Sequence, residues 1–209
     1  MKVGILGSGI VAKTLGAGFR KHGHEVMLGT RNPAKLKDWA AQGGAISDFA
    51  GAAAFGDIVV LAVKGSAALE ALKLAGSGLE GKPVLDATNP IADQPAEDGV
   101  LRFFTDLNQS LMERLQSQFP KSRFVKVFSS VGAGAMVNPG FVGGRPTMFI
   151  CGNDDAAKQT TTAILDQFGW DVDDMGSVVA ARAIEPLCML WCIPGFKQND
   201  WMHAFKMLR

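Results

Sequence analysis

The first 32 residues of the chain constrain its fold more than any other stretch. A short apolar run at residues 3–6 stops at Gly7, and an amphipathic stretch follows and ends at Gly23. Residues 25–29, with Val26 and Leu28, then have the pattern of a second strand. Short apolar runs separated by an amphipathic stretch of helix length are typical of two parallel strands joined by a crossover helix. The start of the chain therefore predicts a βαβ unit and an α/β fold.

The turn of this unit reads Gly7-Ser8-Gly9-Ile10-Val11-Ala12. Gly7 allows a tight turn, Gly9 lets backbone N–H groups approach a pyrophosphate, and Ala12 stands where a third glycine would let the helix pack closely on the strand. The helix N-terminus supplies free donors and a favourable dipole for a phosphate. A glycine-rich turn without a ligand is the alternative, but the strand–turn–helix context favours a dinucleotide site. The candidate pyrophosphate contacts are Gly7, Ser8, Gly9, Ile10 and Val11.

The end of the second strand indicates which dinucleotide binds. An NAD enzyme places Asp or Glu there to bind the ribose 2′-hydroxyl, whereas this chain has Thr30 and Arg31. The guanidinium of Arg31 can hold a 2′-phosphate in charge-assisted bonds, Thr30 can add a hydroxyl, and Lys35 can supply a second charge. Lys37 competes with Lys35 for that role, and these charges could also be merely solvated. The pattern favours NADP over NAD.

Later strands supply further candidates at the same edge of the sheet. Residues 58–63 form a continuous apolar run that is typical of a central strand, and ligands bind beyond the carboxyl ends of such strands. Val63 and Lys64 should therefore border the cofactor, although Lys64 could be a surface lysine. Residues 83–86 predict the next strand, after which Asn89 is held extended by the following proline. Its amide could face a ribose or a nicotinamide carboxamide, or Asn89 could be an ordinary turn residue.

The second half of the chain predicts the rest of the sheet. Asp106 is expected to cap a helix that runs through Phe119, after a long irregular segment at residues 91–106. The apolar tail, residues 196–209, should dock on its own body or on a second subunit. The further strands are expected at 124–128, 147–150 and 170–172, and the further helices at 153–168 and 178–191, the last of them broken by Pro194-Gly195.

Length and charge limit the class of protein. At 209 residues the chain can bury its core as one domain with at most a small appended lobe. We predict a doubly wound, mainly parallel Rossmann sheet, with an NADP-binding domain at residues 1–150 and a small C-terminal α/β lobe at 151–209. The 21 basic and 20 acidic residues leave a formal charge of +1, which gives no field to attract nucleic acid or an anionic membrane. The partner should be a small molecule.

The apolar runs indicate where the protein is located, and the spacing of the cysteines indicates whether it binds a metal. Glycines and charges interrupt the start of the chain, so no signal peptide is expected there, and no apolar run is expected to span a bilayer. A cytoplasmic protein is expected. Cys151, Cys188 and Cys192 form no Cys-x-x-Cys motif, and no His or acidic residue stands at ligand spacing from the last two. We expect packed core cysteines and no metal site.

The residue inventory also limits the chemistry. The chain contains no tyrosine, which excludes a short-chain dehydrogenase that protonates a carbonyl through Tyr-x-x-x-Lys. His22 and His24 precede the second strand, away from the ligand edge, and His203 lies in the tail, so no His–carboxylate proton relay is expected. Hydride transfer between two redox cofactors needs no such relay, because the cofactors carry the chemistry. No catalytic side chain is therefore predicted.

Several segments together resemble a known family. They are GSGIVA, LGTRN, DIVVLAVK, VLDATNPI, VKVFSSVGA, TMFICGND and DMGSVVAARAIEPL. They look like the NADP oxidoreductase family that depends on the deazaflavin coenzyme F(420), and like the related reductase domain of the STEAP metalloreductases. The likeness runs from Lys2 to about Leu190. The chain differs from archaeal members at Lys64-Gly65, where they have a proline and an aromatic residue, and in residues 91–106.

The resemblance implies a Rossmann domain with a small C-terminal lobe that passes hydride between NADPH and a deazaflavin or flavin. It places the pyrophosphate on Ser8, Gly9, Ile10 and Val11, the 2′-phosphate on Thr30, Arg31 and Lys35, and the nicotinamide near Val63, Lys64, Asn89 and Ala133. We expect the acceptor ring in an apolar cleft whose floor is Gly132, Ala133 and Gly134, and we expect a homodimer. A reductase of a small imine or keto acid, or an NADP-binding regulator without turnover, remains the alternative, because fold alone does not separate them.

Overall fold

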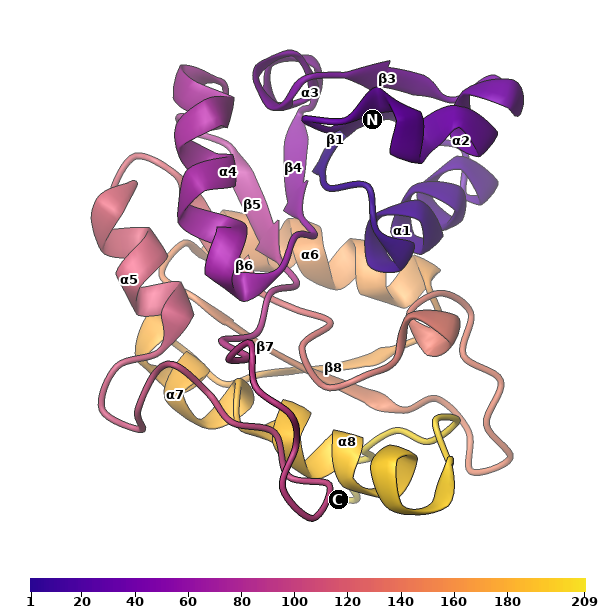
Figure 1. The fold of residues 1–209 in the computed structure, drawn as a ribbon, viewed down its shortest axis with the longest axis vertical. Coiled ribbons are helices and arrows are strands. Elements are labelled where there is room, and N and C mark those ends of the chain that lie inside the picture. Colours follow the sequence, from indigo (N-terminus) through magenta and orange to yellow (C-terminus); the bar gives the residue numbers. More distant parts are fainter.

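The computed structural model describes all 209 residues and contains one sheet of eight strands with helices on both faces (Figure 1). The strand order is β3-β2-β1-β4-β5-β6-β7-β8. Neighbours from β3 to β6 are parallel, β7 is antiparallel to β6, and β8 is parallel to β7. The order reverses direction between β1 and β4, which is the switch point of a doubly wound sheet. The predicted fold class is confirmed.

The elements have the following bounds. The strands are β1 Lys2–Leu6, β2 Glu25–Gly29, β3 Ala45–Ser47, β4 Ile58–Leu61, β5 Pro83–Asp86, β6 Arg123–Lys126, β7 Thr147–Gly152 and β8 Asp171–Asp174. The α-helices are α1 Ile10–Lys21, α2 Lys37–Ala41, α3 Phe49–Phe55, α4 Ala68–Ala75, α5 Leu111–Gln118, α6 Asp155–Gln167, α7 Ala181–Ile184 and α8 Leu187–Gln198. Short 3₁₀ turns occupy Pro33–Leu36, Gly65–Ala67, Gly76–Leu79, Ala133–Ala135 and Val178–Ala180.

The core lies on both faces of the sheet because successive strand residues point to opposite sides. Val60 of β4 belongs to the core cluster that contains side chains of α1 and α6, whereas its neighbours Val59 and Leu61 belong to the cluster that contains side chains of α3, α4 and α5. A strand buried on both faces must be apolar throughout, which explains the unbroken run at residues 58–61. The cluster that contains Val60 also contains residues from Val3, near the start of the chain, to Trp170, so distant parts of the sequence share one core.

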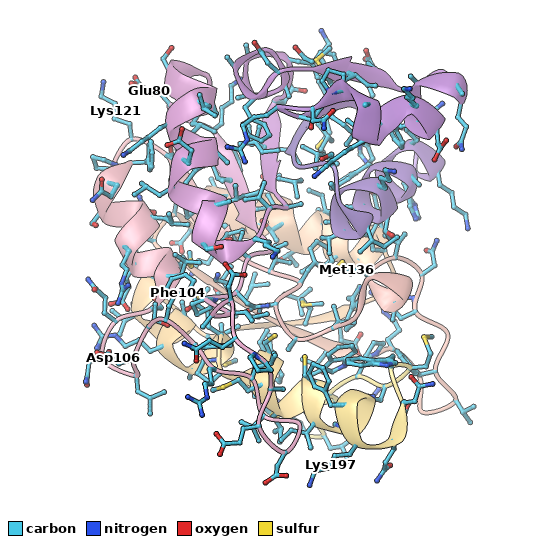
Figure 2. All side chains as sticks on the ribbon, viewed as in Figure 1. Glu80, Phe104, Asp106, Lys121, Met136 and Lys197 are labelled. Carbon is cyan, nitrogen blue, oxygen red and sulfur yellow. The ribbon has the colours of Figure 1, made fainter.

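Two predicted helix boundaries were wrong. The helix expected to begin at Asp106 begins at Leu111, because Ser110 and Glu113 form a capping box, and Asp106 instead accepts from backbone N–H groups in the preceding loop. Figure 2 shows Asp106 in that loop. The last helix was expected to run over residues 178–191 and to break at Pro194. The structure divides it into a 3₁₀ turn, α7 and α8, and α8 continues through Pro194 to Gln198 and ends where Asn199 adopts a left-handed conformation with φ 54°.

The C-terminal tail docks on its own chain, as one of the two predicted alternatives. The backbone carbonyl of Phe205 accepts from the N–H of Thr147, and the N–H of Met207 donates to the hydroxyl of the same threonine. His203 and Trp191 exchange two hydrogen bonds, from the indole N–H to the His203 carbonyl at 2.9 Å and between the imidazole and the Trp191 carbonyl at 2.8 Å. The tail therefore lies beside the start of β7 and against α8.

One helical stretch, Val178–Gln198, is long and apolar enough by length and composition to cross a membrane. The expectation that no run reaches that length does not hold by this measure. In the most apolar window of the stretch, 39% of the residues are buried inside the chain. Core helices of soluble proteins pass the same test, so the finding is weak evidence for a membrane span.

The predicted boundary between two domains at residue 150 falls inside β7. The core cluster that contains Val3 and Ile5 also contains Ile164, Phe168 and Trp170. The division into an NADP-binding domain and a lobe stays a prediction, which an unfolding experiment can test.

Candidate functional site

A cavity of about 520 Å³ lies at the carboxyl ends of β1, β2 and β4. In Figure 1, β4 runs between α4 and α1, and the turn after β4 lies near the N-terminal ends of both helices. The cavity thus occupies the position that a doubly wound sheet offers to a dinucleotide. Its lining residues are Gly7, Ser8, Gly9, Thr30, Arg31, Asn32, Lys35, Phe49, Ala62, Val63, Lys64 and Ala67.

The turn after β1 shows that its two glycines meet different needs. Gly7 has φ +147°, and a Cβ there would lie 2.3 Å from the Ala62 carbonyl oxygen and 3.2 Å from the Ala12 Cβ. The protein itself therefore requires Gly7, and Ala12 gives the predicted close packing. Gly9 has an ordinary φ of −81°, and a Cβ on it would meet no protein atom within 4 Å. The chain has no packing reason for Gly9, which fits a backbone that a pyrophosphate approaches.

The start of α1 is open to an anion. No side chain caps it, and its first turn contains no acidic residue. The first N–H groups of a helix lack partners within the helix, and the dipole is positive at this end. Ile10 and Val11, which form that first turn, do not line the cavity with their side chains, so any contact they make to a phosphate is through the backbone.

The end of β2 brings together two cations that have no acidic partner. Arg31 and Lys35 are both exposed, both line the cavity, and neither forms an ion pair. Thr30 is only 5% exposed, and its hydroxyl donates to the Asn32 carbonyl and accepts from the Asn32 N–H. Thr30 therefore shapes the turn that presents Arg31, and its predicted hydroxyl contact would compete with these two bonds. Lys37 does not line the cavity.

The charges around the cavity have one sign. Three lining residues are cationic, Arg31, Lys35 and Lys64, and none is acidic. The Nζ of Lys64 lies 3.3 Å from Asp93, but both side chains are mostly exposed, so this pair is weak. The cavity therefore attracts a ligand that carries several negative charges, such as a dinucleotide phosphate.

The structure places Asn89 and Ala133 outside the lining of this cavity. Asn89 nevertheless contacts the turn after β4, because a Cβ on Gly65 would lie only 2.0 Å from the Asn89 carbonyl oxygen. The side-chain Nδ2 of Asn89 donates to the Ser129 carbonyl at 2.8 Å. Ala133 is half-buried and begins a 3₁₀ turn after β6. Asn89 thus follows the end of β5, and Ala133 lies further beyond the end of β6, in a turn that contacts α1.

Part of the predicted floor for an acceptor ring is occupied by the chain itself. A Cβ on Gly132 would lie 2.7 Å from the Trp191 ring, so this glycine makes room for α8 and not for a ligand. Gly134 lies beneath Met202 of the tail, whose Sδ would be 3.8 Å from an added Cβ. The expectation that Gly132 forms an open floor is wrong, which leaves Ala133 and Gly134.

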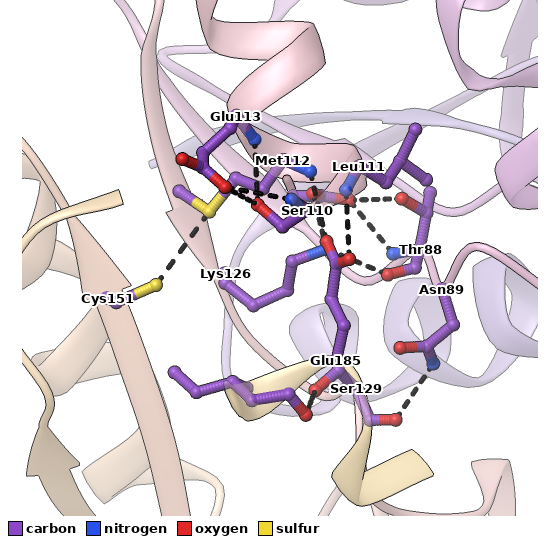
Figure 3. Close-up of polar contacts among 12 residues, drawn as sticks. Thr88, Asn89, Ser110, Leu111, Met112, Glu113, Lys126, Ser129, Cys151 and Glu185 are labelled. Atoms are coloured by element: carbon purple, nitrogen blue, oxygen red, sulfur yellow. Dashed lines mark hydrogen bonds and ion pairs between the residues drawn. The ribbon is translucent and has the colours of Figure 1, made fainter. Parts of the chain in front are cut away.

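A buried charge cluster lies where β5 and β6 end (Figure 3). The Nζ of Lys126 lies 2.7 Å from Asp86 and 2.9 Å from Glu185, and all three side chains are buried. Burial alone would lower the pKa of Lys126, but the two carboxylates raise that pKa well above its usual range. The sequence predictions missed this cluster, although Asp86 and Lys126 are polar residues at paired positions in apolar strands.

The cysteines are buried, as predicted. Burial raises the pKa of the Cys151 thiol to about 12, so this thiol stays protonated and unreactive. The thiols of Cys188 and Cys192 interact on α8, which raises the pKa of the first and lowers that of the second. Both pack with Trp191 in a small apolar cluster.

The sheet, the glycine turn and the acid-free cationic cavity define a dinucleotide-binding protein of the Rossmann class. The family model for NADP oxidoreductases, coenzyme F(420)-dependent, matches residues 2–90. A solved structure from Arthrobacter sp. FB24, assigned as an F(420)-dependent NADP-reductase, is 32% identical, covers all of both chains and superimposes with a TM-score of 0.93. The chain belongs to this family and is an NADP-dependent oxidoreductase.

Two further matches show how far the similarity extends. The metalloreductase STEAP3 of Rattus norvegicus is 30% identical over 197 residues, which is 92% of this chain but only 38% of that protein. The chain thus spans less than half of the length of this relative. An imine reductase from Streptomyces aurantiacus matches 94% of this chain with a TM-score of 0.69 and 16% identity, which shows a shared fold alone.

Proposed function

We propose that the chain transfers hydride between NADP(H) and a deazaflavin or flavin acceptor. The observation that carries this proposal is the cavity at the ends of β1, β2 and β4, which combines an open glycine backbone with three cations and no acid. The pyrophosphate binds the backbone of the turn after β1, and the 2′-phosphate binds Arg31 and Lys35. The proposed cofactor-binding residues are Gly7, Ser8, Gly9, Ile10, Val11, Thr30, Arg31, Lys35, Val63, Lys64, Asn89 and Ala133.

The residues of the chain act by binding and orientation. NADP(H) supplies or accepts the hydride, so no side chain needs to form a covalent bond or move a proton. Holding two reactants in one geometry accounts for a large part of such a rate enhancement. Lys64 lines the cavity at the end of β4, and Asn89 lies outside the lining but against the turn at Gly65 that follows Lys64. We place the nicotinamide beside these two residues. The cavity residues would therefore orient the nicotinamide toward the second ring.

Stopped-flow oxidation of bound NADPH tests this function. The enzyme is mixed with a deazaflavin, with a flavin, with a ferric chelate, or with a small imine or keto acid, and the loss of NADPH absorbance is followed. We expect oxidation by a deazaflavin or a flavin. Oxidation by the imine or keto acid alone would assign the chain to small-molecule reduction, and tight NADPH binding with no oxidation by any acceptor would show a regulator.

We also propose that the chain forms a homodimer in the cytoplasm. Leu190, Phe196 and Met202 of α8 and the tail are each at least half exposed, and apolar side chains gathered in one region favour contact with a second copy. Light scattering coupled to size exclusion tests the dimer, and a monomer at all concentrations would contradict it.

A further inference from the structure

The hydrogen bond to the Ser129 carbonyl fixes which way the side-chain amide of Asn89 points. A backbone carbonyl only accepts hydrogen bonds, so the amide atom that faces the Ser129 carbonyl at 2.8 Å must be the NH₂ group. The other amide atom, Oδ1, is shielded from water and has no hydrogen-bond partner. Buried acceptors are rarely left unpaired, because the loss of their water is then uncompensated. Oδ1 is therefore an acceptor held ready for a donor that the chain does not supply.

The backbone before Asn89 is fixed by the buried charge cluster. The Nζ of Lys126 donates to the Thr88 carbonyl at 2.9 Å, and this carbonyl belongs to the peptide that joins Thr88 to Asn89. Oδ1 of Asp86 accepts from the Thr88 N–H at 2.9 Å and from its hydroxyl at 2.6 Å. The peptides on both sides of Thr88 are thus held by side chains at the ends of β5 and β6 (Figure 3).

The cluster is saturated by its own ion pairs. Oδ2 of Asp86 is its one buried oxygen without an aligned hydrogen bond, and that oxygen lies 2.7 Å from the Nζ of Lys126. Lys126 uses its ammonium on Asp86, Glu185 and the Thr88 carbonyl. The two carboxylates exceed the one ammonium by a negative charge, and the N-terminus of α5 compensates it, because Glu185 accepts from the N–H groups of Leu111 at 2.9 Å and Met112 at 3.0 Å. Because the cluster is buried and its groups are already paired, it can affect a ligand only by fixing the backbone around Thr88, which in turn places Asn89.

The backbone is strained at Phe128, the residue before the serine that binds the Asn89 side chain. Phe128 has φ +59° and is 1% exposed, although a bulky side chain disfavours positive φ. It directly precedes Ser129, whose carbonyl holds the Asn89 amide. Such conformations persist where the surrounding structure imposes them, and they occur often at ligand sites. The strain therefore lies at the residue that aims the Ser129 carbonyl.

We propose that Oδ1 of Asn89 accepts a hydrogen bond from the carboxamide NH₂ of the nicotinamide, and that Lys126, with Asp86 and Glu185, is the positioning group for this contact. The inference rests on the proposed function, because it places the nicotinamide at the end of β5. The Oδ1 atom is covered in this structure, so the side chains over it shift when the carboxamide binds. Lys126 thereby selects the orientation of the nicotinamide without touching it.

The Asn89 contact is tested by pairing a variant with a cofactor analogue. Asn89→Ala removes the acceptor, and the 3-acetylpyridine analogue of NADP⁺ has a methyl ketone in place of the carboxamide and so lacks the donor. We expect Asn89→Ala to weaken NADP⁺ binding about tenfold, as for one lost hydrogen bond, and to weaken the analogue by less than about threefold. Adenosine 2′,5′-bisphosphate, which lacks the nicotinamide half, should bind the variant as it binds wild type. Equal losses for NADP⁺ and the analogue would overturn the assignment.

The positioning role is tested by neutralising the whole cluster. Lys126→Met combined with Asp86→Asn and Glu185→Gln leaves no unpaired buried charge, and Thr88→Val is a milder variant that removes only the hydroxyl bond to Asp86. We expect both to retain affinity for adenosine 2′,5′-bisphosphate and to lose the preference for NADP⁺ over the acetylpyridine analogue. A folded variant that keeps this preference, or a parallel loss for both probes, would contradict a positioning role. If wild type transfers hydride but shows no preference, the inference fails and the proposed function stands.

Discussion

At the scale of single residues, the two glycines of the turn after β1, Gly7 and Gly9, differ in the space that the protein leaves for an added Cβ. The sequence pattern assigns the tight turn to Gly7 and the approach of a pyrophosphate to Gly9. The structure gives the physical ground for this difference, because a Cβ at Gly7 collides with the Ala62 carbonyl, whereas a Cβ at Gly9 meets no protein atom within 4 Å. One glycine is required by the fold, and the other is required only if a ligand comes close.

We expect Gly9→Ala to leave the free energy of unfolding nearly unchanged and to weaken NADPH binding about tenfold, because the new methyl group lies in the path of the pyrophosphate. Gly7→Ala is the matched control and should lower the free energy of unfolding by at least about 1–3 kcal/mol, because the collision with the Ala62 carbonyl adds to the backbone strain. Urea titration and fluorescence titration with NADPH measure the two effects. A Gly9→Ala variant with wild-type affinity would show that the pyrophosphate binds elsewhere.

We expect Arg31→Ala to weaken NADPH far more than NADH, because only NADPH carries the 2′-phosphate. A charge-assisted hydrogen bond contributes about 1.5–3 kcal/mol, which corresponds to a loss of about ten- to a hundredfold in affinity. Lys37→Ala is the control, since Lys37 is exposed on the next helix but does not line the cavity. Isothermal titration with both nucleotides gives the result, and an equal loss for NADPH and NADH would refute the phosphate contact.

The part of the site that could be predicted is the part with local signals. Gly7, Gly9 and Arg31 follow strands that are recognisable from short apolar runs, and the structure brings them to one cavity. Asn32 and Phe49 also line that cavity. Their positions depend on how β2 and α3 pack, and no sequence motif predicts that packing. Lys126 and Glu185 could not be paired from the sequence, because their contact forms only when the C-terminal helices return to the sheet.

At the scale of elements, the two wrong helix boundaries have different causes. Asp106 and Ser110 are both good capping residues, but only Ser110 is followed three residues later by a glutamate that completes a capping box. Pro194 and Gly195 look like a break, yet a Cβ on Gly195 would lie 2.3 Å from the Trp201 ring. Gly195 is thus needed for packing of the tail, and α8 continues past the proline.

Glu113 links α5 to α7 and makes stability depend on pH. The hydrogen bond from Arg182, with further bonds from Ser110, lowers the pKa of Glu113 below its ordinary value of 4.5, while burial opposes the shift. A lowered carboxyl pKa stabilises the fold above the ordinary value, and this stabilisation is lost as the pH falls through the lowered value. We expect the urea midpoint of wild type to exceed that of Glu113→Gln at pH 7, with the difference shrinking toward pH 3. A constant difference would exclude this linkage.

At the scale of the whole molecule, the sheet joins parts that the sequence suggested were separate. β7 and β8 extend the same sheet, and α6 packs on β5 and β6 of the first 150 residues. Each of the two core clusters contains residues from both sides of residue 150, so the two parts of the chain share their cores. The tail adds contacts to β7 and α8, which ties the end of the chain to the same sheet.

We therefore expect the chain to unfold in one cooperative transition despite its length. Trp39 and Trp170 lie in the same core cluster but on either side of the boundary predicted at residue 150. Two variants that each retain only one of these tryptophans, with the others replaced by phenylalanine, report on the two sides separately. Urea titrations followed by fluorescence should give the same midpoint for both, and the same midpoint by far-UV circular dichroism measured on each variant. An earlier transition for the Trp170 reporter would show that residues 151–209 form an independent lobe, as the sequence-based division predicts.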